Sequence, residues 1–163
     1  HLSSRRQRQM CIRDRHMEKF VKNNREINNS VSVKTSISGV RTIYKALKDK
    51  KVICFAADQV PKRGLGEHIK FYNKMAYTTT LVQNLASKTN CPVIYLCMNS
   101  NINGFLSVSI KPCSDDIYDN SKHLQLVNKD IEKLINRRPI DYSWEYKRFK
   151  RSLPEEENLY SGI

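Results

Sequence analysis

Residues 52–57 (VICFAA) constrain the fold more than any other part of the chain. The run is apolar at every position, and it includes β-branched and aromatic side chains. A strand that is apolar on both faces is typical of the interior of a sheet that helices cover on each side. A second run of this kind, at residues 92–98, has the same character. Both runs are therefore predicted to be strands, the first of them in the centre of the sheet.

Amphipathic segments lie before, between and after these runs. One apolar stripe follows Ser38 at helical spacing and consists of Val40, Ile43, Tyr44 and Leu47. A second stripe predicts a helix over residues 121–137, which Pro139 ends. Residues 105–110 alternate between polar and apolar side chains and predict a half-exposed strand. Because strands and helices alternate, the sequence predicts an α/β fold, with a mixed sheet flanked by helices.

The charge balance limits the class of partner. The 163 residues include 29 Lys and Arg against 16 Asp and Glu, a formal net charge of +13. This excess predicts anionic partners: nucleic acid, an acidic protein or phosphate-bearing lipid.

The chain has no apolar run of about 18 residues, the length that a membrane-spanning helix needs. The five cysteines and four histidines show no metal-ligand spacing, so neither a metal nor a cofactor is expected.

Residues 1–15 (HLSSRRQRQMCIRDR) are interpreted as a non-native segment. They contain five arginines, one acid and no periodic apolar pattern, and the string RQMCIRDR resembles a translated sequencing adapter. Such segments are excluded from fold reasoning. Without the five arginines and the one aspartate the net charge is +9. The expected domain organisation is therefore a non-native segment at 1–15, followed at 16–163 by the C-terminal portion of a single domain.

Three features can be interpreted chemically from the residues alone. Asp58 directly follows the first apolar run and is expected either to orient a substrate group or to cap a loop. Lys62 and Arg63 follow it and either bind phosphate or form a solvated loop. The segment 144–150 (WEYKRFK) interleaves aromatic and basic side chains. It is typical of nucleic-acid or headgroup binding, or of a last helix that packs its aromatic residues inward.

Three blocks resemble one known family, and they occur in the family's order: residues 41–59 (RTIYKALKDKKVICFAADQ), 62–80 (KRGLGEHIKFYNKMAYTTT) and 135–150 (INRRPIDYSWEYKRFK). The family is that of the bacterial lipid A late acyltransferases, the lauroyl and myristoyl transferases of lipopolysaccharide synthesis. The chain departs from the family pattern at Tyr146, where the family usually has His, and at Asn73, where it has Gly. The resemblance implies the C-terminal part of a lysophospholipid-acyltransferase-like domain.

The resemblance also implies a reaction and a location. A fatty acyl chain passes from an acyl carrier protein thioester to a hydroxyl of a phosphorylated lipid A precursor, at the cytoplasmic face of the inner membrane. The implied partners are the acyl-acyl carrier protein, the phosphorylated glycolipid and the membrane surface, without nucleic acid. The alternative function from composition is a basic nucleic-acid-binding module. The substrate-side candidates are Arg41, Asp58, Lys62, Arg63 and Arg148.

The family's base is a histidine followed, after four residues, by Asp or Glu. The positions five residues after the four histidines hold Arg6, Val21, Asn73 and Asn128. No catalytic residue is therefore assigned within the chain, and the motif and a membrane anchor are expected upstream. The chain by itself is predicted to be inactive.

Overall fold

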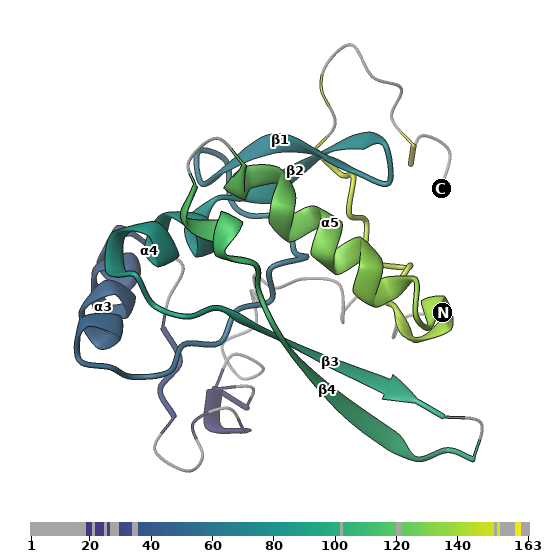
Figure 1. Cartoon of the computed structure of the whole chain (residues 1–163), viewed down its shortest axis with the longest axis horizontal. Coiled ribbons are helices and arrows are strands. Elements are labelled where there is room, and N and C mark those ends of the chain that lie inside the picture. The colour runs from purple at the N-terminus through teal and green to yellow at the C-terminus, as the bar shows by residue number, and fades with distance from the viewer. Residues whose placement is uncertain are drawn as a thin grey trace. The chain divides into compact units, whose positions relative to one another are not determined.

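The computed structural model describes residues 19–20, 22–24, 26, 30–33, 36–101, 103–119, 122–151, 153 and 159–160. The chain divides into two compact units, His1–Lys51 and Val52–Ile163, and each is described by itself. Figure 1 labels the elements of both units. The segment 1–15, predicted to be non-native, lies outside the described residues.

The first unit contains the helix α3, Ile37–Lys48. The hydroxyl of Ser36 accepts a hydrogen bond from the main-chain N–H of Gly39 at 3.1 Å and so caps the helix start. Lys45 and Lys48 lie in the last turn, where positive charge is favourable to the helix dipole. The predicted helix is confirmed, but it begins before Ser38 because Ser36 supplies the cap.

The second unit begins its regular structure with an antiparallel hairpin of β1, Gly66–Phe71, and β2, Lys74–Thr79. Phe71 pairs with Lys74, so Tyr72 and Asn73 form a two-residue turn. Their φ angles are +46° and +61°. Positive φ at both central residues is what a type I′ turn requires, and Asn tolerates it well.

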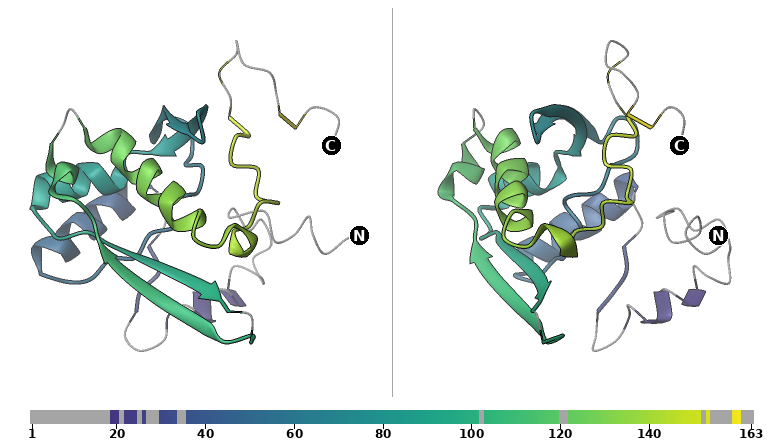
Figure 2. Two further views of the ribbon diagram at one scale, coloured as in Figure 1. Left: turned by 45° about the vertical axis from the view of Figure 1, so that its right-hand side comes forward. Right: turned by 90° about the vertical axis from the view of Figure 1, so that its right-hand side faces the viewer.

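A second antiparallel hairpin consists of β3, Ile94–Ser100, and β4, Leu106–Pro112. In Figures 1 and 2 it extends away from the β1–β2 hairpin. One face of this hairpin carries six aliphatic side chains that are 55–71% exposed: Ile94, Leu96, Met98, Leu106, Val108 and Ile110. We call it the aliphatic face. The strand predicted at residues 92–98 is confirmed as β3, although no described element of its unit covers this face.

The predicted mixture of strands and helices is confirmed, but the strand pairing differs from the predicted mixed sheet. The described strands form two separate two-stranded antiparallel sheets, β1–β2 and β3–β4. The predicted strand at residues 52–57 has no regular secondary structure, and Val52 is 93% exposed. An apolar run becomes a strand only where another strand takes up its backbone hydrogen bonds, and no described strand pairs with this one.

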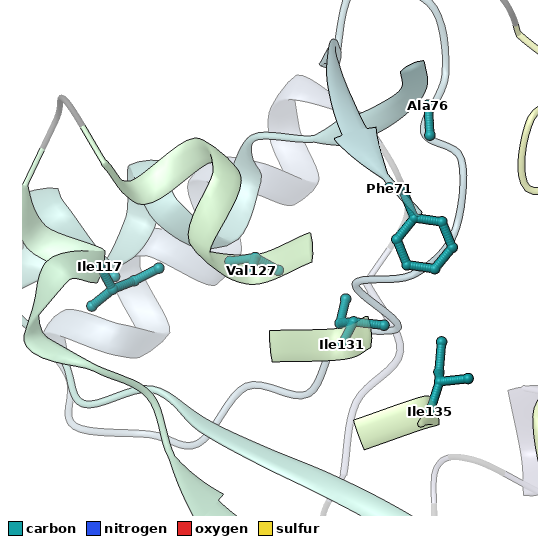
Figure 3. Close-up of a cluster of buried hydrophobic side chains, with 7 residues drawn as sticks. Phe71, Ala76, Ile117, Val127, Ile131 and Ile135 are labelled. Atoms are coloured by element: carbon teal, nitrogen blue, oxygen red, sulfur yellow. The ribbon is translucent and has the colours of Figure 1, made fainter. Parts of the chain in front are cut away.

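The core of the second unit lies between the β1–β2 hairpin and the helices. The helices that contribute to it are α4, Leu81–Thr89, α5, His123–Ile135, and the short 3₁₀ helix η1, Asp115–Tyr118. A second 3₁₀ helix, η2, Pro139–Asp141, has no buried residue. Figure 3 shows the buried cluster. Its members are Phe71, Ala76, Ala86, Ile117, Val127, Ile131 and Ile135. Burying a side chain such as Phe71 contributes roughly 1.5–3 kcal/mol to the stability of the fold.

Candidate functional site

An exposed loop with two adjacent cations joins the apolar run to β1. We call residues 58–66 the basic loop. Lys62 and Arg63 are exposed within it, and Asp58 at its start is half-buried. The main-chain N–H of Leu65 donates to the carbonyl oxygen of Lys62 at 3.1 Å and closes a turn around the two cations. Three of the substrate-side candidates from the sequence thus share one loop.

A tyrosine hydroxyl from β2 holds the second half of the basic loop. The hydroxyl of Tyr77 accepts hydrogen bonds from the main-chain N–H groups of Gly64 at 2.9 Å and of Gly66 at 3.2 Å. Gly64 has a φ of +80°, a conformation that L side chains rarely adopt. A Cβ atom on Gly66 would stand 2.3 Å from the carbonyl oxygen of Thr78, so the loop packs against β2 as closely as a glycine allows.

The C-terminal segment holds the first half of the basic loop. We call residues 142–151 the strap. A last helix was one of the two interpretations of residues 144–150, and the structure shows a series of turns instead. The hydroxyl of Tyr146 accepts a hydrogen bond from the main-chain N–H of Val60 at 2.8 Å. An Nη atom of Arg151 donates to the carbonyl oxygen of Pro61 at 2.6 Å. The strap therefore fixes the backbone just before Lys62.

Arg148 lies in the strap and is 3% exposed. Its guanidinium donates to the carbonyl oxygen of Tyr77 at 2.9 Å and to the hydroxyl of Thr78 at 2.7 Å, and it lies over the ring of Phe71. Burial lowers the pKa of this guanidinium, and the negative charge of Asp58 is among the groups that act in the opposite direction. These contacts join the strap to β2, beside the basic loop.

Three buried polar atoms in this region have no hydrogen-bond partner among the described residues: Oε1 of Gln59, the hydroxyl of Tyr142 and Nε of Arg148. Tyr142 has a raised pKa, mainly because of burial and next because of the negative charge of Asp58. The Asp58 carboxylate thus interacts electrostatically, from the start of the basic loop, with two residues of the strap, Tyr142 and Arg148.

The structure places the five predicted substrate-side residues unequally. Asp58, Lys62 and Arg63 lie in the basic loop, and Arg148 lies in the strap with its Nη atoms bound to β2. Arg41 is an exposed residue of α3 in the first unit, whose placement relative to the second is not described. That these residues bind substrate stays a prediction.

Sequence reasoning missed the groups that hold the basic loop: Tyr77, Tyr146 and Arg151. Tyr146 was noted as a departure from the family pattern and as one of the aromatic residues of 144–150, and Tyr77 as part of a block that resembles the family; neither was expected to hold the loop. A tyrosine hydroxyl that binds the main chain of a distant loop leaves no local pattern, since Tyr146 and Val60 are 86 positions apart.

The cations and aromatic rings of the strap engage each other and the core. Lys147 lies over the ring of Tyr160, Lys150 over that of Tyr146, and Arg151 over that of Tyr77. Phe149 packs against the core cluster. These contacts engage cations and Tyr and Phe rings that a nucleic-acid interface would use, while Trp144 is 55% exposed. They support the interpretation of the segment as a packed part of the fold.

Both histidines in the described residues use a ring nitrogen to bind the main chain. Nε2 of His68 is 2.9 Å from the carbonyl oxygen of Arg151, and Nδ1 of His123 is 2.8 Å from that of Asp119. A carbonyl oxygen can only accept, so these nitrogens donate. Within the described part of the chain no cluster of His, Cys, Asp or Glu could hold a metal ion, and no helix is long and apolar enough to cross a membrane.

Comparison with known proteins identifies the family. The profile for bacterial lipid A biosynthesis acyltransferases matches residues 2–151. A search of curated proteins finds no match. The matched range includes most of the arginine-rich residues 1–15, so their interpretation as a non-native segment stays a prediction. Because the match covers nearly all of its 163 residues, the chain belongs to the bacterial lipid A biosynthesis acyltransferase family.

Proposed function

We propose that the chain takes part in transferring a fatty acyl group from an acyl carrier protein thioester to a hydroxyl of a phosphorylated lipid A precursor, with the basic loop holding a phosphate of the acceptor. The family match over residues 2–151 is the observation that carries this proposal. The net charge of +13 supports it, because the phosphorylated glycolipid and an acidic carrier protein are both anionic.

The basic loop suits a phosphate because two exposed cations follow one another between fixed backbone points. Arg63 can offer a bidentate pair of N–H groups to phosphate oxygens, and Lys62 adds a point charge. Asp58 at the start of the loop can accept from a sugar hydroxyl. We propose that Arg148 acts on the acceptor through the loop, since its own Nη atoms are bound to β2. Arg41 is proposed as a further anion contact.

The reaction joins the acceptor oxygen to the acyl carbonyl carbon and breaks the thioester C–S bond. The acceptor hydroxyl gives its proton to a base, and the carrier thiol leaves and takes up a proton. No histidine of this chain is followed, five positions on, by an acid. We therefore propose that the chain does not catalyse the transfer by itself. We further propose that it works at the cytoplasmic face of the inner membrane, where anionic lipid also attracts a basic surface.

Binding of a phosphorylated lipid A precursor and of its dephosphorylated form, both in neutral micelles, tests the role of the basic loop. Tight binding of only the phosphorylated form is expected. The double variant Lys62→Gln/Arg63→Gln should lose roughly tenfold in affinity, which corresponds to about 1.4 kcal/mol.

A matched control removes the same charge elsewhere. Lys88 and Lys129 are exposed on α4 and α5, and Lys88→Gln/Lys129→Gln should change the affinity less than twofold at physiological salt. Equal losses in the two double variants would contradict a phosphate site in the basic loop. Formation of acylated product by the unaided chain would contradict the proposed lack of catalysis, and would leave the binding result unaffected.

A further inference from the structure

We infer that Tyr77 and Tyr146 are positioning residues that hold the basic loop ready for a phosphate group before the ligand arrives. The inference rests on the proposed function of this loop, and it assigns to two tyrosine hydroxyls a role in affinity although neither belongs to the loop itself. The ligand chemistry is a phosphate that carries negative charge, either free or as a lipid headgroup.

The two hydroxyls bind the loop backbone on either side of its cations. Tyr146 accepts from the N–H of Val60, two residues before Lys62. Tyr77 accepts from the N–H groups of Gly64 and Gly66, directly after Arg63. The turn that carries both cations therefore lies between backbone positions that the two hydroxyls bind. Both hydroxyls come from other elements, the strap and β2.

Fixing a loop in advance lowers the entropy that binding must remove. An ordered residue loses backbone conformational entropy, so a loop that is ordered only by its ligand binds that ligand with a lower affinity. The loop between the two hydroxyls contains Gly64, whose backbone is intrinsically the most flexible of any residue type. Without the Tyr77 hydroxyl this part of the loop has more freedom to lose.

The ring of each tyrosine contacts a cation of the strap. The guanidinium of Arg151 lies 5.5 Å from the ring centre of Tyr77, and the same arginine donates to the carbonyl oxygen of Pro61. The ammonium of Lys150 lies 4.7 Å from the ring centre of Tyr146. The tyrosines thus have defined positions from which to hold the loop, as a positioning role requires.

The test replaces each hydroxyl alone, in the full chain. Tyr77→Phe and Tyr146→Phe remove one oxygen atom and keep the rings that pack. Tyr118→Phe is the control, because its hydroxyl also binds the main chain, as a donor to the carbonyl oxygen of Cys91 at 2.9 Å, and this bond does not involve the loop. Affinity is measured by calorimetry with inorganic phosphate, and by flotation with phosphatidylcholine vesicles that contain phosphatidic acid. Amide hydrogen exchange at Val60 and Gly64 reports loop order.

Both loop variants are expected to lose about fivefold in affinity and to exchange these amides faster, while Tyr118→Phe retains wild-type values for both. Binding to phosphatidic acid alone, with the same pattern among the variants, supports the inference and identifies a lipid headgroup as the source of the phosphate. Faster amide exchange with unchanged affinity overturns the positioning role and leaves the proposed function intact. A wild-type chain that binds neither probe overturns the phosphate-binding function, and the inference with it. If Tyr77→Phe loses its cooperative thermal transition, Tyr146→Phe decides the result.

Discussion

Arg148 donates a 2.7 Å hydrogen bond to the hydroxyl of Thr78, and the two residues are 3% and 0% exposed. The same hydroxyl accepts from the side-chain amide of Asn128 at 3.1 Å and donates to the carbonyl oxygen of Ala76 at 2.9 Å. A hydroxyl has one donor and two acceptor positions, and all three are used here. One side chain of β2 therefore joins α5 and the strap to the hairpin.

Replacing Thr78 with valine should destabilise the fold although the shape of the side chain hardly changes. The substitution removes one acceptor from a buried amide and one from a buried guanidinium, which keep only their bonds to the carbonyl oxygens of Lys70 and Tyr77. A buried N–H group left without its acceptor costs roughly 1–3 kcal/mol. We expect the free energy of unfolding, measured by urea denaturation, to fall by about 3 kcal/mol.

Thr79→Val is the control for this substitution. Thr79 lies next to Thr78 on the same strand, is partly exposed, and accepts one weaker bond of 3.3 Å from the N–H of Leu81. It should lose about 1 kcal/mol or less. Equal losses at the two positions would show that the buried network around Thr78 contributes nothing of its own.

Gly66→Ala should destabilise the attachment of the basic loop. The added Cβ would stand 2.3 Å from the carbonyl oxygen of Thr78 and 2.7 Å from Cγ of Pro61, so main chain has to move. Overpacking of this kind costs typically about 1–3 kcal/mol. Thermal unfolding should show the loss, together with faster amide exchange in the loop.

Gly104→Ala is the control for this substitution, because it introduces backbone strain without close packing. Gly104 has a φ of +78° and no heavy atom within 4 Å of an added Cβ. Alanine there should cost only the roughly 1–2 kcal/mol of a left-handed conformation, with no effect on exchange in the basic loop. Slower or unchanged exchange in Gly66→Ala would contradict the close approach of the loop to β2.

Local signals predicted those elements that local interactions determine. The helices α3 and α5 follow apolar stripes and polar ends that can be read within one segment, and both were predicted. The segment 52–57 was wrongly predicted as a strand, because a strand depends on a partner elsewhere in the chain. The same holds for the site. Asp58, Lys62 and Arg63 were predicted as a charged loop because they lie within one short segment. The tyrosines that hold the loop were not, because their contacts join distant positions.

Substitutions on the aliphatic face of the β3–β4 hairpin test whether its side chains are exposed in solution. Leu96 is 61% and Val108 is 60% exposed, so the double variant Leu96→Thr/Val108→Thr should change the free energy of unfolding by less than about 1 kcal/mol. Its binding of a hydrophobic dye such as ANS should fall, because the exposed apolar surface is reduced. Val127→Thr, at a position that is 1% exposed, should instead cost about 2 kcal/mol. Destabilisation of the double variant as large as that of Val127→Thr would show that the face is covered in solution.

Asp141 should make the stability of the fold depend on acid pH. Its pKa lies below the ordinary value, mainly because the hydroxyl of Ser100 donates to the carboxylate at 2.7 Å, and the charge of Arg138 acts in the same direction. A lowered pKa in the folded state means that the unfolded chain binds the proton more readily. The contribution of the Asp141 carboxylate to the free energy of unfolding is therefore complete when the pH is above the ordinary pKa of about 4, and it is lost as the pH falls through the lower folded pKa.

Urea midpoints between pH 7 and pH 3 should show a difference between the wild-type chain and Asp141→Asn that is constant above about pH 5 and shrinks below about pH 4. Ser100→Ala should reduce this acid dependence without abolishing it, since Arg138 and the main-chain N–H of Ser100 still stabilise the carboxylate. A difference that stays constant down to pH 3 would refute the role of the Ser100 hydroxyl in stabilising the ionised carboxylate.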